Sequence, residues 1–393
     1  MAENPQRILQ VSYVMEREGV QNLIMNLYRK LDRSQFQFDF LINPNEDQYK
    51  GAFDSEIRDL GGRVFHAPRF SDNPFAYKRF CDHLFSSHPE WKVIHGHFLR
   101  SAAATYMNSA RKHGKYVIAH SHNTQDQGNP LKNIAIRCMR FPVRFSADYY
   151  MACSQAAGRF AFGGRIVGSN RFQVLNNGID ATKLCCSNVE HMRAKERLGL
   201  DVNTPVYGHV GRYNEQKNHE FLVDVFEKIH HVQPHAKLIM LGDGPDFQTI
   251  RRKVEQLGLV ENVIMPGSVS DVDVHLKAFD VFVFPSLYEG LPLAGIEAQA
   301  AGVYCLFSDT IDEKVMCTPW SKRIALECGA EKWAEEAISM YECASDGAVA
   351  RESGADYVRL AGYDINDATR MICERYRMAA ASVDMKEREV FRR

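Results

Sequence analysis

The sequence predicts an α/β protein built on mainly parallel sheets and divided into about two domains. Short apolar runs rich in β-branched and aromatic residues alternate along the chain with segments whose apolar residues recur at helical spacing. This alternation is typical of parallel strands joined by helices that cover both faces of a sheet. The chain has 393 residues, which is too long for one ordinary core. The strand pattern also restarts after a polar stretch near the middle of the chain.

The composition excludes several classes of protein. With 45% hydrophobic residues and a net charge of -1, the chain is typical of a globular protein and has no overall attraction to nucleic acid, so we expect no nucleic-acid partner. The N-terminal residues, MAENPQRILQ, lack the apolar region of a signal peptide, and no apolar run is long enough to span a bilayer. We therefore expect a cytoplasmic protein. The ten cysteines show neither a CxxC pair nor metal-ligand spacing, which predicts reduced thiols and no metal site.

The first half begins with a predicted strand, Arg7–Ser12, and a loop that ends in Gly19. A helix is predicted next, because apolar residues recur at helical spacing over Val20–Leu31. A glycine at such a turn lets a ligand approach the backbone closely. The loop has no GxGxxG motif, which disfavours a dinucleotide-dependent dehydrogenase. Further strands are predicted at Phe36–Ile42, Val64–Ala67, Val93–His95, Tyr116–His120, Tyr149–Cys153 and Phe172–Leu175.

Two pairs of histidines stand where predicted strands finish: His95 with His97, and His120 with His122. Ligands of parallel sheets bind outside the carboxyl ends of the strands. A single histidine at such a place is more often structural, but two pairs at adjacent strand ends favour a polar pocket. Neutral histidine can take a proton or hold a hydroxyl group near neutral pH.

The segment Leu131–Phe145 is basic, with Lys132, Arg137, Arg140 and Arg144 and no acidic residue. Apolar residues interleave with these charges, so the segment is a candidate for peripheral contact with an anionic membrane surface at the inner face of the cell membrane. A helix with one buried face and solvated basic residues explains the pattern at least as well. We keep the membrane contact as a hypothesis beside this alternative.

In the second half, the predicted strand Pro205–Val210 leads into a loop that contains Gly211, Arg212 and Lys217, ahead of a helical segment. Two cations in one strand-end loop suit a diphosphate, because arginine can hold two oxygens at once and lysine acts as a point charge. The alternative is that both are surface charges that pair with nearby glutamates.

Two further strand ends carry glycine. The strand Lys237–Leu241 runs into Gly242–Pro245, and another strand and loop follow at Val263–Val269. The motif Asp271-Val272-Asp273 resembles a DxD metal motif. We interpret it as helix capping, because it stands at the start of the helical segment Val274–Phe279 and aspartate is favourable there.

A strand, a loop and a helix start are predicted within Val281–Gly302. The strand Val281–Phe284 is followed by a loop with Glu289, and Pro292 stands near the start of a helix that contains Glu297. Free N–H groups at a helix start attract an anion of phosphate size, whereas carboxylates accept hydrogen bonds from hydroxyl groups. The stretch therefore suits a phosphorylated, polyhydroxylated ligand. The alternative is that both glutamates are solvated or capping residues.

Together these motifs resemble the family 4 retaining glycosyltransferases of the GT-B fold, and among them the bacterial capsule and exopolysaccharide transferases. The likeness runs from about Ile8 to about Tyr376. It is carried by Glu289 and Glu297 in EGLPLAGIEAQAAG, by Gly211-Arg212 with Lys217, by Gly242-Asp243-Gly244-Pro245 and by Asn177-Gly178-Ile179-Asp180. It implies two Rossmann-like domains that face a cleft. Residues 1–180 would form the acceptor side, residues 186–368 would bind the nucleotide sugar, and residues 369–393 would return to the first domain as a helix.

The resemblance also implies roles for single residues. Arg212 and Lys217 would bind the diphosphate of the donor, a UDP-sugar or a nucleotide sugar with another base, without a metal or another cofactor. Glu297 would hold the ribose and Glu289 the donor sugar. From the first domain, His122 would line the reaction centre together with Glu289, Arg212 and Lys217. His97 would lie on the side of the glycan or lipid-linked acceptor. Further donor contacts are implied for Gly19, Gly211, Gly242, Gly244, Val269, Gly290, Leu291 and Leu293.

The chain departs from the family pattern at two positions: Glu18 precedes Gly19 where paired glycines are usual, and Pro292 stands where a glycine N–H is usual. The chemistry agrees with the resemblance, since fixed cations and amides stabilise the charge that builds up on a leaving diphosphate. The family is thought to retain the anomeric configuration. Two alternatives remain, a sugar-nucleotide epimerase with the same diphosphate site and a non-catalytic sugar-nucleotide-binding subunit.

Overall fold

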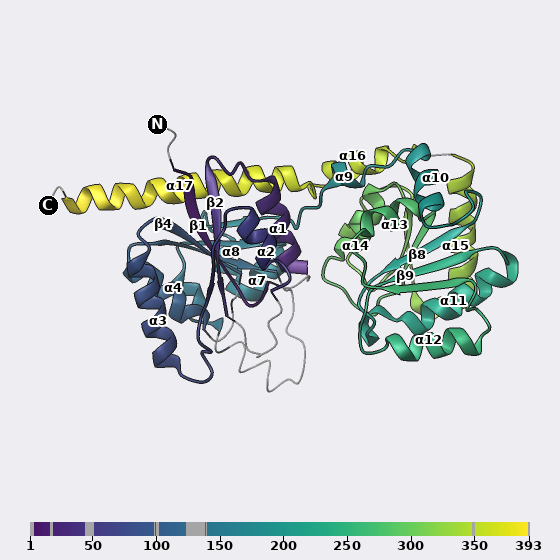
Figure 1. The fold of residues 1–393 in the computed structure, drawn as a ribbon, viewed down its shortest axis with the longest axis horizontal. Helices are drawn as coiled ribbons and strands as arrows, with labels where there is room; N and C mark the ends of the chain where they lie inside the picture. The colour runs from purple at the N-terminus through teal and green to yellow at the C-terminus, as the bar shows by residue number, and fades with distance from the viewer. Residues whose placement is uncertain are drawn as a thin grey trace. The chain divides into compact units, whose positions relative to one another are not determined.

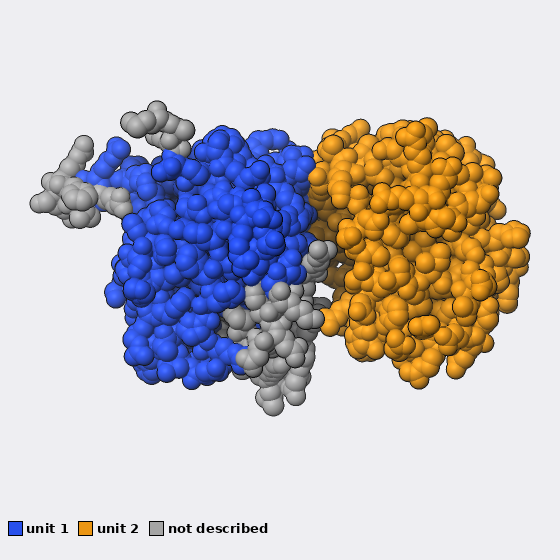
Figure 2. Space-filling view, in the orientation of Figure 1, with its two compact units in different colours: residues 1–178, 365–393 blue, residues 179–364 orange. Residues whose placement is uncertain are grey.

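The computed structural model describes residues 4–15, 19–43, 51–97, 99, 102–122, 138, 140–347 and 350–391. The chain divides into two compact units, which are coloured separately in Figure 2. Unit 1 comprises residues 1–178 and 365–393, and unit 2 comprises residues 179–364. Each unit is built on a parallel sheet, so the predicted fold class, two parallel-sheet α/β domains, is confirmed.

The sheet of unit 1 has the strand order β3-β2-β1-β4-β5-β6-β7, and all its strand pairs are parallel. Helices cover both faces, as the apolar alternation requires. The core on one face joins the sheet to α1, α2 and α17, and the core on the other joins it to α3, α4, α7 and α8. The strands are β1 (Gln6–Ser12), β2 (Phe36–Ile42), β3 (Val64–His66), β4 (Trp91–Gly96), β5 (Tyr116–Ser121), β6 (Tyr149–Ala152) and β7 (Phe172–Val174). The helices are α1 (Gly19–Lys30), α2 (Asp54–Asp59), α3 (Pro74–Ser87), α4 (Ala103–Lys112), α6 (Val143–Ser146), α7 (Gln155–Phe162), α8 (Gly164–Val167) and α17 (Ile365–Phe391).

The C-terminal helix α17 belongs to unit 1 although it follows unit 2 in the sequence, and Figure 1 shows it as the long yellow helix beside β1 and α1. Ile365, Ile372 and Tyr376 are fully buried in the same core as α1. Their helical spacing gives α17 one apolar face, which explains why it packs on the sheet.

The sheet of unit 2 has the order β10-β9-β8-β11-β12-β13 and is again parallel. One core joins it to α11, α12 and α15, and the other joins it to α9, α13, α14 and α16. The strands are β8 (Val206–Val210), β9 (Lys237–Leu241), β10 (Val263–Gly267), β11 (Val281–Phe284), β12 (Tyr304–Ser308) and β13 (Ser321–Ile324). The helices are α9 (Ala181–Leu184), α10 (Asn188–Arg197), α11 (His219–Val232), α12 (Phe247–Gln256), α13 (Val272–Ala278), α14 (Leu293–Ala300), α15 (Gly329–Ser345) and α16 (Ser353–Leu360), with 3-10 turns η1 (Glu215–Lys217), η2 (Glu313–Val315) and η3 (Leu326–Cys328).

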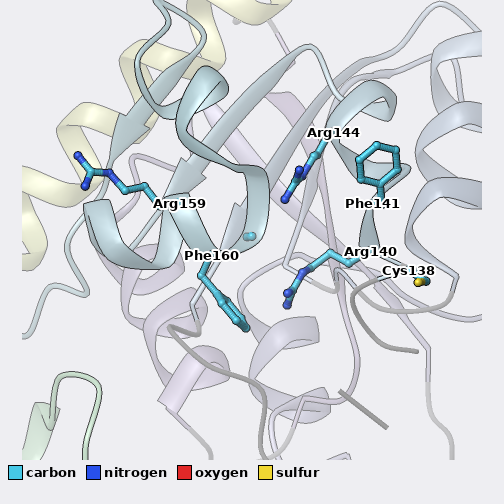
Figure 3. Close-up of a pocket in the computed structure, with 7 residues that line it drawn as sticks. Cys138, Arg140, Phe141, Arg144, Arg159 and Phe160 are labelled. Atoms are coloured by element: carbon cyan, nitrogen blue, oxygen red, sulfur yellow. The ribbon is translucent and has the colours of Figure 1, made fainter. Parts of the chain in front are cut away.

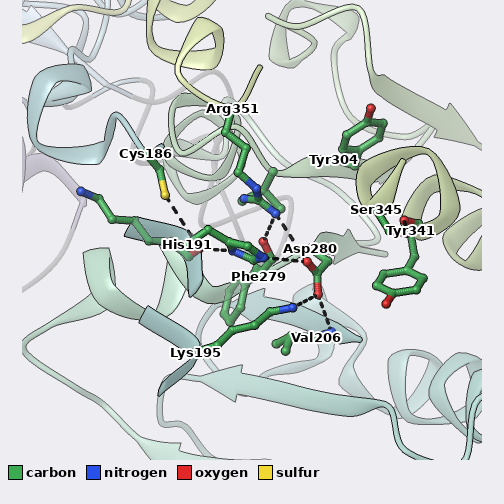
Figure 4. A network of polar contacts seen from close by, with 12 residues as sticks. Cys186, His191, Lys195, Val206, Phe279, Asp280, Tyr304, Tyr341, Ser345 and Arg351 are labelled. Atoms are coloured by element: carbon green, nitrogen blue, oxygen red, sulfur yellow. Dashed lines mark hydrogen bonds and ion pairs between the residues drawn. The ribbon is translucent and has the colours of Figure 1, made fainter. Parts of the chain in front are cut away.

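A buried ionic network around Asp280 fixes the end of the unit 2 sheet where β11 begins (Figure 4). The Asp280 carboxylate accepts hydrogen bonds from Nζ of Lys195 at 2.8 Å and from the backbone N–H of Val206 at 2.8 Å, and it lies 3.0 Å from Nε2 of His191. Arg351 donates to the carbonyl of Phe279 at 3.0 Å. Burial opposes ionisation of Asp280, but the His191 contact and the Lys195 charge outweigh it and lower the pKa of this carboxyl. The network therefore ties α10 to the sheet.

Each sheet reverses its strand order at one point, between β1 and β4 in unit 1 and between β8 and β11 in unit 2. Parallel α/β sheets bind ligands outside the carboxyl ends of the strands at such a point, because the connecting helices turn to opposite faces there. The loops after β8 and β11 contain the cations and the first glutamate that the sequence singles out. The topology of unit 2 thus selects these loops independently of any motif.

Candidate active site

The loops after β8 and β11 are joined by backbone and side-chain hydrogen bonds. The backbone N–H of Leu287 donates to the carbonyl of Gln216 at 2.8 Å, and the Gln216 amide donates to the carbonyl of Tyr288 at 2.9 Å. Asn218 has a left-handed backbone conformation, with φ 56°, and its side chain donates to the carbonyl of Pro285 at 3.2 Å. This conformation is uncommon outside glycine and is best tolerated by asparagine and aspartate. The two loops therefore form one connected surface.

Lys217 and Glu289 form an ion pair on this surface, with Nζ 2.5 Å from Oε1. Lys217 also lies over the Phe284 ring, with Nζ 4.5 Å from the ring centroid. The side chains of Lys217 and Glu289 are only 16% and 9% exposed, so water screens the pair weakly. Lys217 does not pair with a glutamate of its own loop, which was the alternative to a ligand role. Its partner lies in the loop after β11, the neighbouring strand of the sheet.

Arg212 is exposed, and among the described residues it has no hydrogen-bond or ion-pair partner. The loop after β8 thus holds one paired cation and one free cation. A guanidinium without a protein partner is available for bidentate binding of an anion such as a phosphate group.

Helix α14 begins after Pro292, which provides no side-chain cap, and its first turn has no acidic residue. The positive end of the helix dipole is therefore not neutralised by a nearby carboxylate of its own first turn. Glu297 lies further along the helix and is partly exposed, and its carboxylate has no hydrogen-bond or ion-pair partner among the described residues. Burial raises the pKa of Glu297 from 4.5 to about 7, and the charge of Lys183 offsets only part of this effect. An unpaired acceptor in a poorly solvated place suits the hydroxyl groups of a ligand.

The glycines after β9 allow a close approach of backbone segments. A Cβ on Gly242 would lie 2.0 Å from the carbonyl oxygen of Gly211, and a Cβ on Gly244 would lie 2.2 Å from the carbonyl oxygen of Tyr213. Hydrogen bonds hold the loops at this spacing, from Gly211 N–H to Leu241 at 2.9 Å and from Gly242 N–H to Gly267 at 3.0 Å. The glycine-rich turn thus has a packing role in shaping the site, in addition to the ligand role predicted for it.

The capping role predicted for the DxD motif is wrong for Asp271. Asp271 occupies the position before α13, but its side chain makes no capping hydrogen bond. It lies 3.5 Å from the guanidinium of Arg197 instead, and Asp273 pairs with Lys183 at 3.0 Å. Both aspartates therefore form ion pairs, with cations from α10 and α9.

In unit 1 the four histidines do come together at the ends of β4 and β5. Nδ1 of His97 lies 2.9 Å from Nε2 of His122, and Nε2 of His95 lies 3.2 Å from Nδ1 of His120. Burial lowers the pKa of all four rings, that of His122 to about 4, so they are neutral at physiological pH. The two predicted pairs thus meet at this sheet edge, and the polar pocket expected from them stays a prediction.

Sequence reasoning missed the partners of these histidines. Gln10 on β1 and Tyr376 on α17 complete the hydrogen-bonded group, with His97 Nε2 3.0 Å from Gln10 Oε1 and Tyr376 Oη 2.7 Å from His95 Nδ1. Polar residues at otherwise apolar positions were the available signal: Gln10 interrupts an apolar strand and is 1% exposed.

The remaining predicted site residues fall at several places. Gly19 is the exposed first residue of α1, and Leu291 and Val269 lie partly buried in the loops after β11 and β10. Glu18, and residues 131–137 and 139 of the basic segment, lie outside the described residues. Gly290 is exposed and Leu293 opens α14.

Comparison with known proteins assigns the chain to a class. A family profile described as "Glycosyl transferases group 1" matches residues 191–355, and one described as "Glycosyltransferase Family 4" matches residues 17–183. The solved structure of Anabaena Alr3699/HepE with UDP and glucose superimposes with a TM-score of 0.72 at 17% identity, over 94% of this chain and 98% of that one. The fold is that of the GT-B glycosyltransferases.

Sequence relatives narrow the class. The glycosyltransferase EpsF of Bacillus subtilis is 33% identical over 93% of this chain and 94% of its own length. The capsular polysaccharide biosynthesis glycosyltransferase CapH of Staphylococcus aureus is 24% identical over 75% of this chain and 78% of its own length. The chain belongs to the family 4 glycosyltransferases, and the predicted resemblance and enzyme class are confirmed.

Proposed function

We propose that this glycosyltransferase moves a sugar from a UDP-sugar to a glycan or lipid-linked acceptor, with retention of configuration, in exopolysaccharide or capsule synthesis. The observation that carries the proposal is the Lys217–Glu289 pair beside the unpartnered Arg212, at the point of unit 2 where the strand order reverses. UDP in the HepE structure and the capsular role in the CapH name support the donor and the pathway.

In the proposed reaction, Arg212 and Lys217 stabilise the charge that builds up on the diphosphate as the sugar–phosphate bond breaks. A bound diphosphate competes with Glu289 for Lys217, which frees this carboxylate to accept hydrogen bonds from sugar hydroxyls. Glu297 accepts hydrogen bonds from the ribose. Because the two cations lie at the leaving group, the proposal needs no metal ion. Gly19 and His122 of unit 1 keep the roles that the resemblance gives them, at the diphosphate and at the reaction centre.

A thermal-shift series with UDP, GDP, ADP and their sugars tests the donor, because a ligand that binds only the folded state raises the melting temperature. We expect UDP and one UDP-sugar to give the largest shift, and Arg212→Ala to abolish it. Equal shifts for all three nucleotides would contradict the choice of base. Product analysis with and without an acceptor separates transfer from epimerisation. A protein that binds the donor but neither transfers nor hydrolyses it would be a non-catalytic subunit.

We also propose peripheral contact with an anionic membrane through unit 1. A pocket of about 640 Å³ lies there, and Figure 3 shows three arginines and two phenylalanines around it. The Arg140 guanidinium lies 4.2 Å from the centroid of the Phe160 ring, and Phe141 and Phe145 are 53% and 68% exposed. Basic groups beside exposed aromatic rings favour an anionic lipid surface. The lining residues are Cys138, Arg140, Phe141, Arg144, Arg159, Phe160 and Ala161. Among the described residues no helix has the length and apolar character needed to cross a membrane.

Vesicle sedimentation tests this contact. We expect the protein to sediment with phosphatidylglycerol vesicles and not with phosphatidylcholine vesicles, and Arg144→Glu with Arg159→Glu to remove the binding. Arg165→Glu is the matched control, because Arg165 is exposed nearby on α8 and does not line the pocket. Equal loss in the control would show a general charge effect instead.

A further inference from the structure

His209 is a fully buried residue of β8, two positions before Gly211. Its Nδ1 lies 2.9 Å from the carbonyl oxygen of Val283 on β11. A carbonyl oxygen can only accept a hydrogen bond, so Nδ1 carries a proton. Burial lowers the pKa of His209 well below its ordinary value, with smaller contributions from His219 and Lys217, so the ring is neutral. In a neutral ring with a protonated Nδ1, the other nitrogen, Nε2, is a bare acceptor.

This Nε2 acceptor has no hydrogen-bond partner among the described residues. The ring of His219, the first residue of α11, packs edge to face against it, with centroids 4.7 Å apart and planes at 73°. His219 does not supply the missing donor, because neither of its own ring nitrogens has a partner in the described part of the chain. A buried acceptor without a donor is unfavourable. A donor that reaches Nε2 of His209 is therefore held there.

The end of the Lys217 side chain lies on the same side of Gly211 as this acceptor. A Cβ on Gly211 would lie 2.9 Å from Nε2 of His209 and 3.2 Å from both Cδ and Cε of Lys217. The Phe284 ring contacts both groups, since it stacks on His209 with centroids 5.1 Å apart and lies 4.5 Å from Nζ of Lys217. Because Gly211 has no side chain, His209 and the end of Lys217 face the same space.

The Lys217 ammonium has more donors than its contacts use. It carries three N–H groups, and its hydrogen bond to a side chain of the described residues goes to Glu289, at 2.5 Å. In the proposed reaction a diphosphate competes with Glu289 for this lysine. Lysine is a point charge on a flexible four-carbon stem, so a lysine that leaves its carboxylate needs a second protein acceptor to keep one orientation.

We infer that His209 is a positioning residue, whose bare Nε2 accepts a hydrogen bond from Lys217 when a diphosphate draws this lysine away from Glu289. The inference rests on the proposed function. One N–H of the ammonium then points at His209 and the others remain for phosphate oxygens. Glu289 neutralises the lysine charge, whereas a neutral imidazole directs the ammonium and leaves its charge in place. The full positive charge is thus available to the leaving diphosphate.

Imidazole nitrogen NMR on protein labelled with ¹⁵N-histidine tests the contact directly. In the free wild type we expect a bare Nε2 at His209. Saturating UDP should move this nitrogen upfield, the direction in which a bare ring nitrogen shifts when it accepts a hydrogen bond. In Lys217→Met with saturating UDP, Nε2 should stay as in the free protein. A shift that persists in Lys217→Met would identify another donor, and a wild-type Nε2 that ignores UDP would equally overturn the inference.

Two substitutions separate the roles of the two ring nitrogens. His209→Asn keeps an amide near the position of Nδ1, which can donate to Val283, and leaves no acceptor at the position of Nε2. His209→Gln places its amide at the position of Nε2 and gives up the bond to Val283. We expect His209→Asn to lower kcat about tenfold or more, the equivalent of roughly one hydrogen bond to a charged group, and His209→Gln to keep most of it. The opposite order would show a structural role and overturn the inference.

His275→Asn is the matched control for the kinetics. His275 is another buried histidine of unit 2, and its Nδ1 lies 3.1 Å from a backbone carbonyl, that of Asp271 at the start of α13. Its kcat should equal that of the wild type, and a loss as large as that in His209→Asn would overturn the inference. If His209→Gln does not fold, His209→Asn and the NMR shift decide. If Nε2 responds to UDP through Lys217 but the wild type transfers no sugar, the proposed function fails and the contact stands.

Discussion

Nζ of Lys217 lies 2.5 Å from Oε1 of Glu289, although 72 residues separate them in the sequence. The pairing follows from the sheet topology, because β8 and β11 are neighbours and the loops at their carboxyl ends meet. In the free protein the pair neutralises one cation of the loop and leaves Arg212 as the exposed one. Under the proposed function, a diphosphate that enters the site would meet Arg212 first and would have to displace Glu289 from Lys217.

The first prediction distinguishes the effects of Arg212 and Lys217 on turnover and on stability. Arg212→Ala should lower turnover about a hundredfold or more, as the loss of other preorganised electrostatic groups does. The melting temperature of Arg212→Ala should differ little from that of the wild type, as is usual for surface substitutions, since Arg212 is exposed and has no partner among the described residues. Lys217→Ala should lose turnover similarly but also stability, because it leaves the Glu289 carboxylate poorly solvated and unpaired. Nucleotide release assays and thermal melts measure the two effects, and near-normal turnover in both variants would refute the site.

The second prediction concerns the stability contribution of Glu297. Its folded-state pKa, about 7, lies above the ordinary 4.5, so the folded chain holds a proton that the unfolded chain releases. Stability from this group is therefore fully present below about pH 4.5 and is lost as the pH rises through about 7. Glu297→Gln stays neutral, so its melting temperature should fall less than that of the wild type between about pH 5 and pH 8. If the melting temperatures of the two proteins changed with pH in the same way, the pKa of the Glu297 carboxyl would not be raised in the folded state.

Nucleotide binding gives a third prediction at the same residue. Ribose hydroxyls that donate to Glu297 favour its ionised form and lower its pKa in the complex. UDP binding near pH 7 should therefore release protons. Calorimetry in buffers with different ionisation enthalpies measures this release, and Glu297→Gln is the control that should release fewer. Net proton uptake by the wild type would contradict the ribose contact.

The fourth prediction tests the glycine-rich turn. Gly244→Ala should destabilise unit 2 by about 1–3 kcal/mol, because the new methyl group would lie 2.2 Å from a backbone oxygen that cannot move away cheaply. Gly19→Ala is the control: a Cβ there would meet nothing within 4 Å, so its stability should hardly change. Thermal melts compare the two. Equal melting temperatures for both variants would mean that the loops after β8 and β9 are free to move apart.

Local patterns predicted most of the strands because their apolar runs are short and clearly bounded. β2, β9 and β11 have the predicted limits, Phe36–Ile42, Lys237–Leu241 and Val281–Phe284. β12 and β13 were not predicted. The apolar run Val303–Phe307 was the signal for β12, whereas Ser321–Ile324 is polar and only partly buried and becomes a strand by pairing with β12.

The contacts of the candidate site were harder to predict, because they depend on strand order. Sequence spacing indicated Lys217, Glu289 and the histidines as candidates, but not which side chain each one contacts. Tyr376 lies 281 residues after His95, and no local pattern relates a helical tyrosine to a strand-end histidine. Such relationships are set by the packing of α17 on the sheet, which only the folded chain shows.

The last prediction addresses the buried network at the opposite end of the unit 2 sheet. Lys195→Met removes a cation whose side chain is 3% exposed and leaves the Asp280 carboxylate with weaker partners, so it should destabilise the protein by about 3–5 kcal/mol. Lys332→Met is the control, because Lys332 forms an exposed pair with Glu335, with nitrogen and oxygen 3.0 Å apart, and water screens such a pair, so its loss should hardly change stability. Denaturant unfolding measures both changes. The Lys195→Met protein that remains folded should keep its kcat, because Asp280 precedes β11 whereas Glu289 follows it. A loss of kcat in this folded protein would show that the network also controls the site.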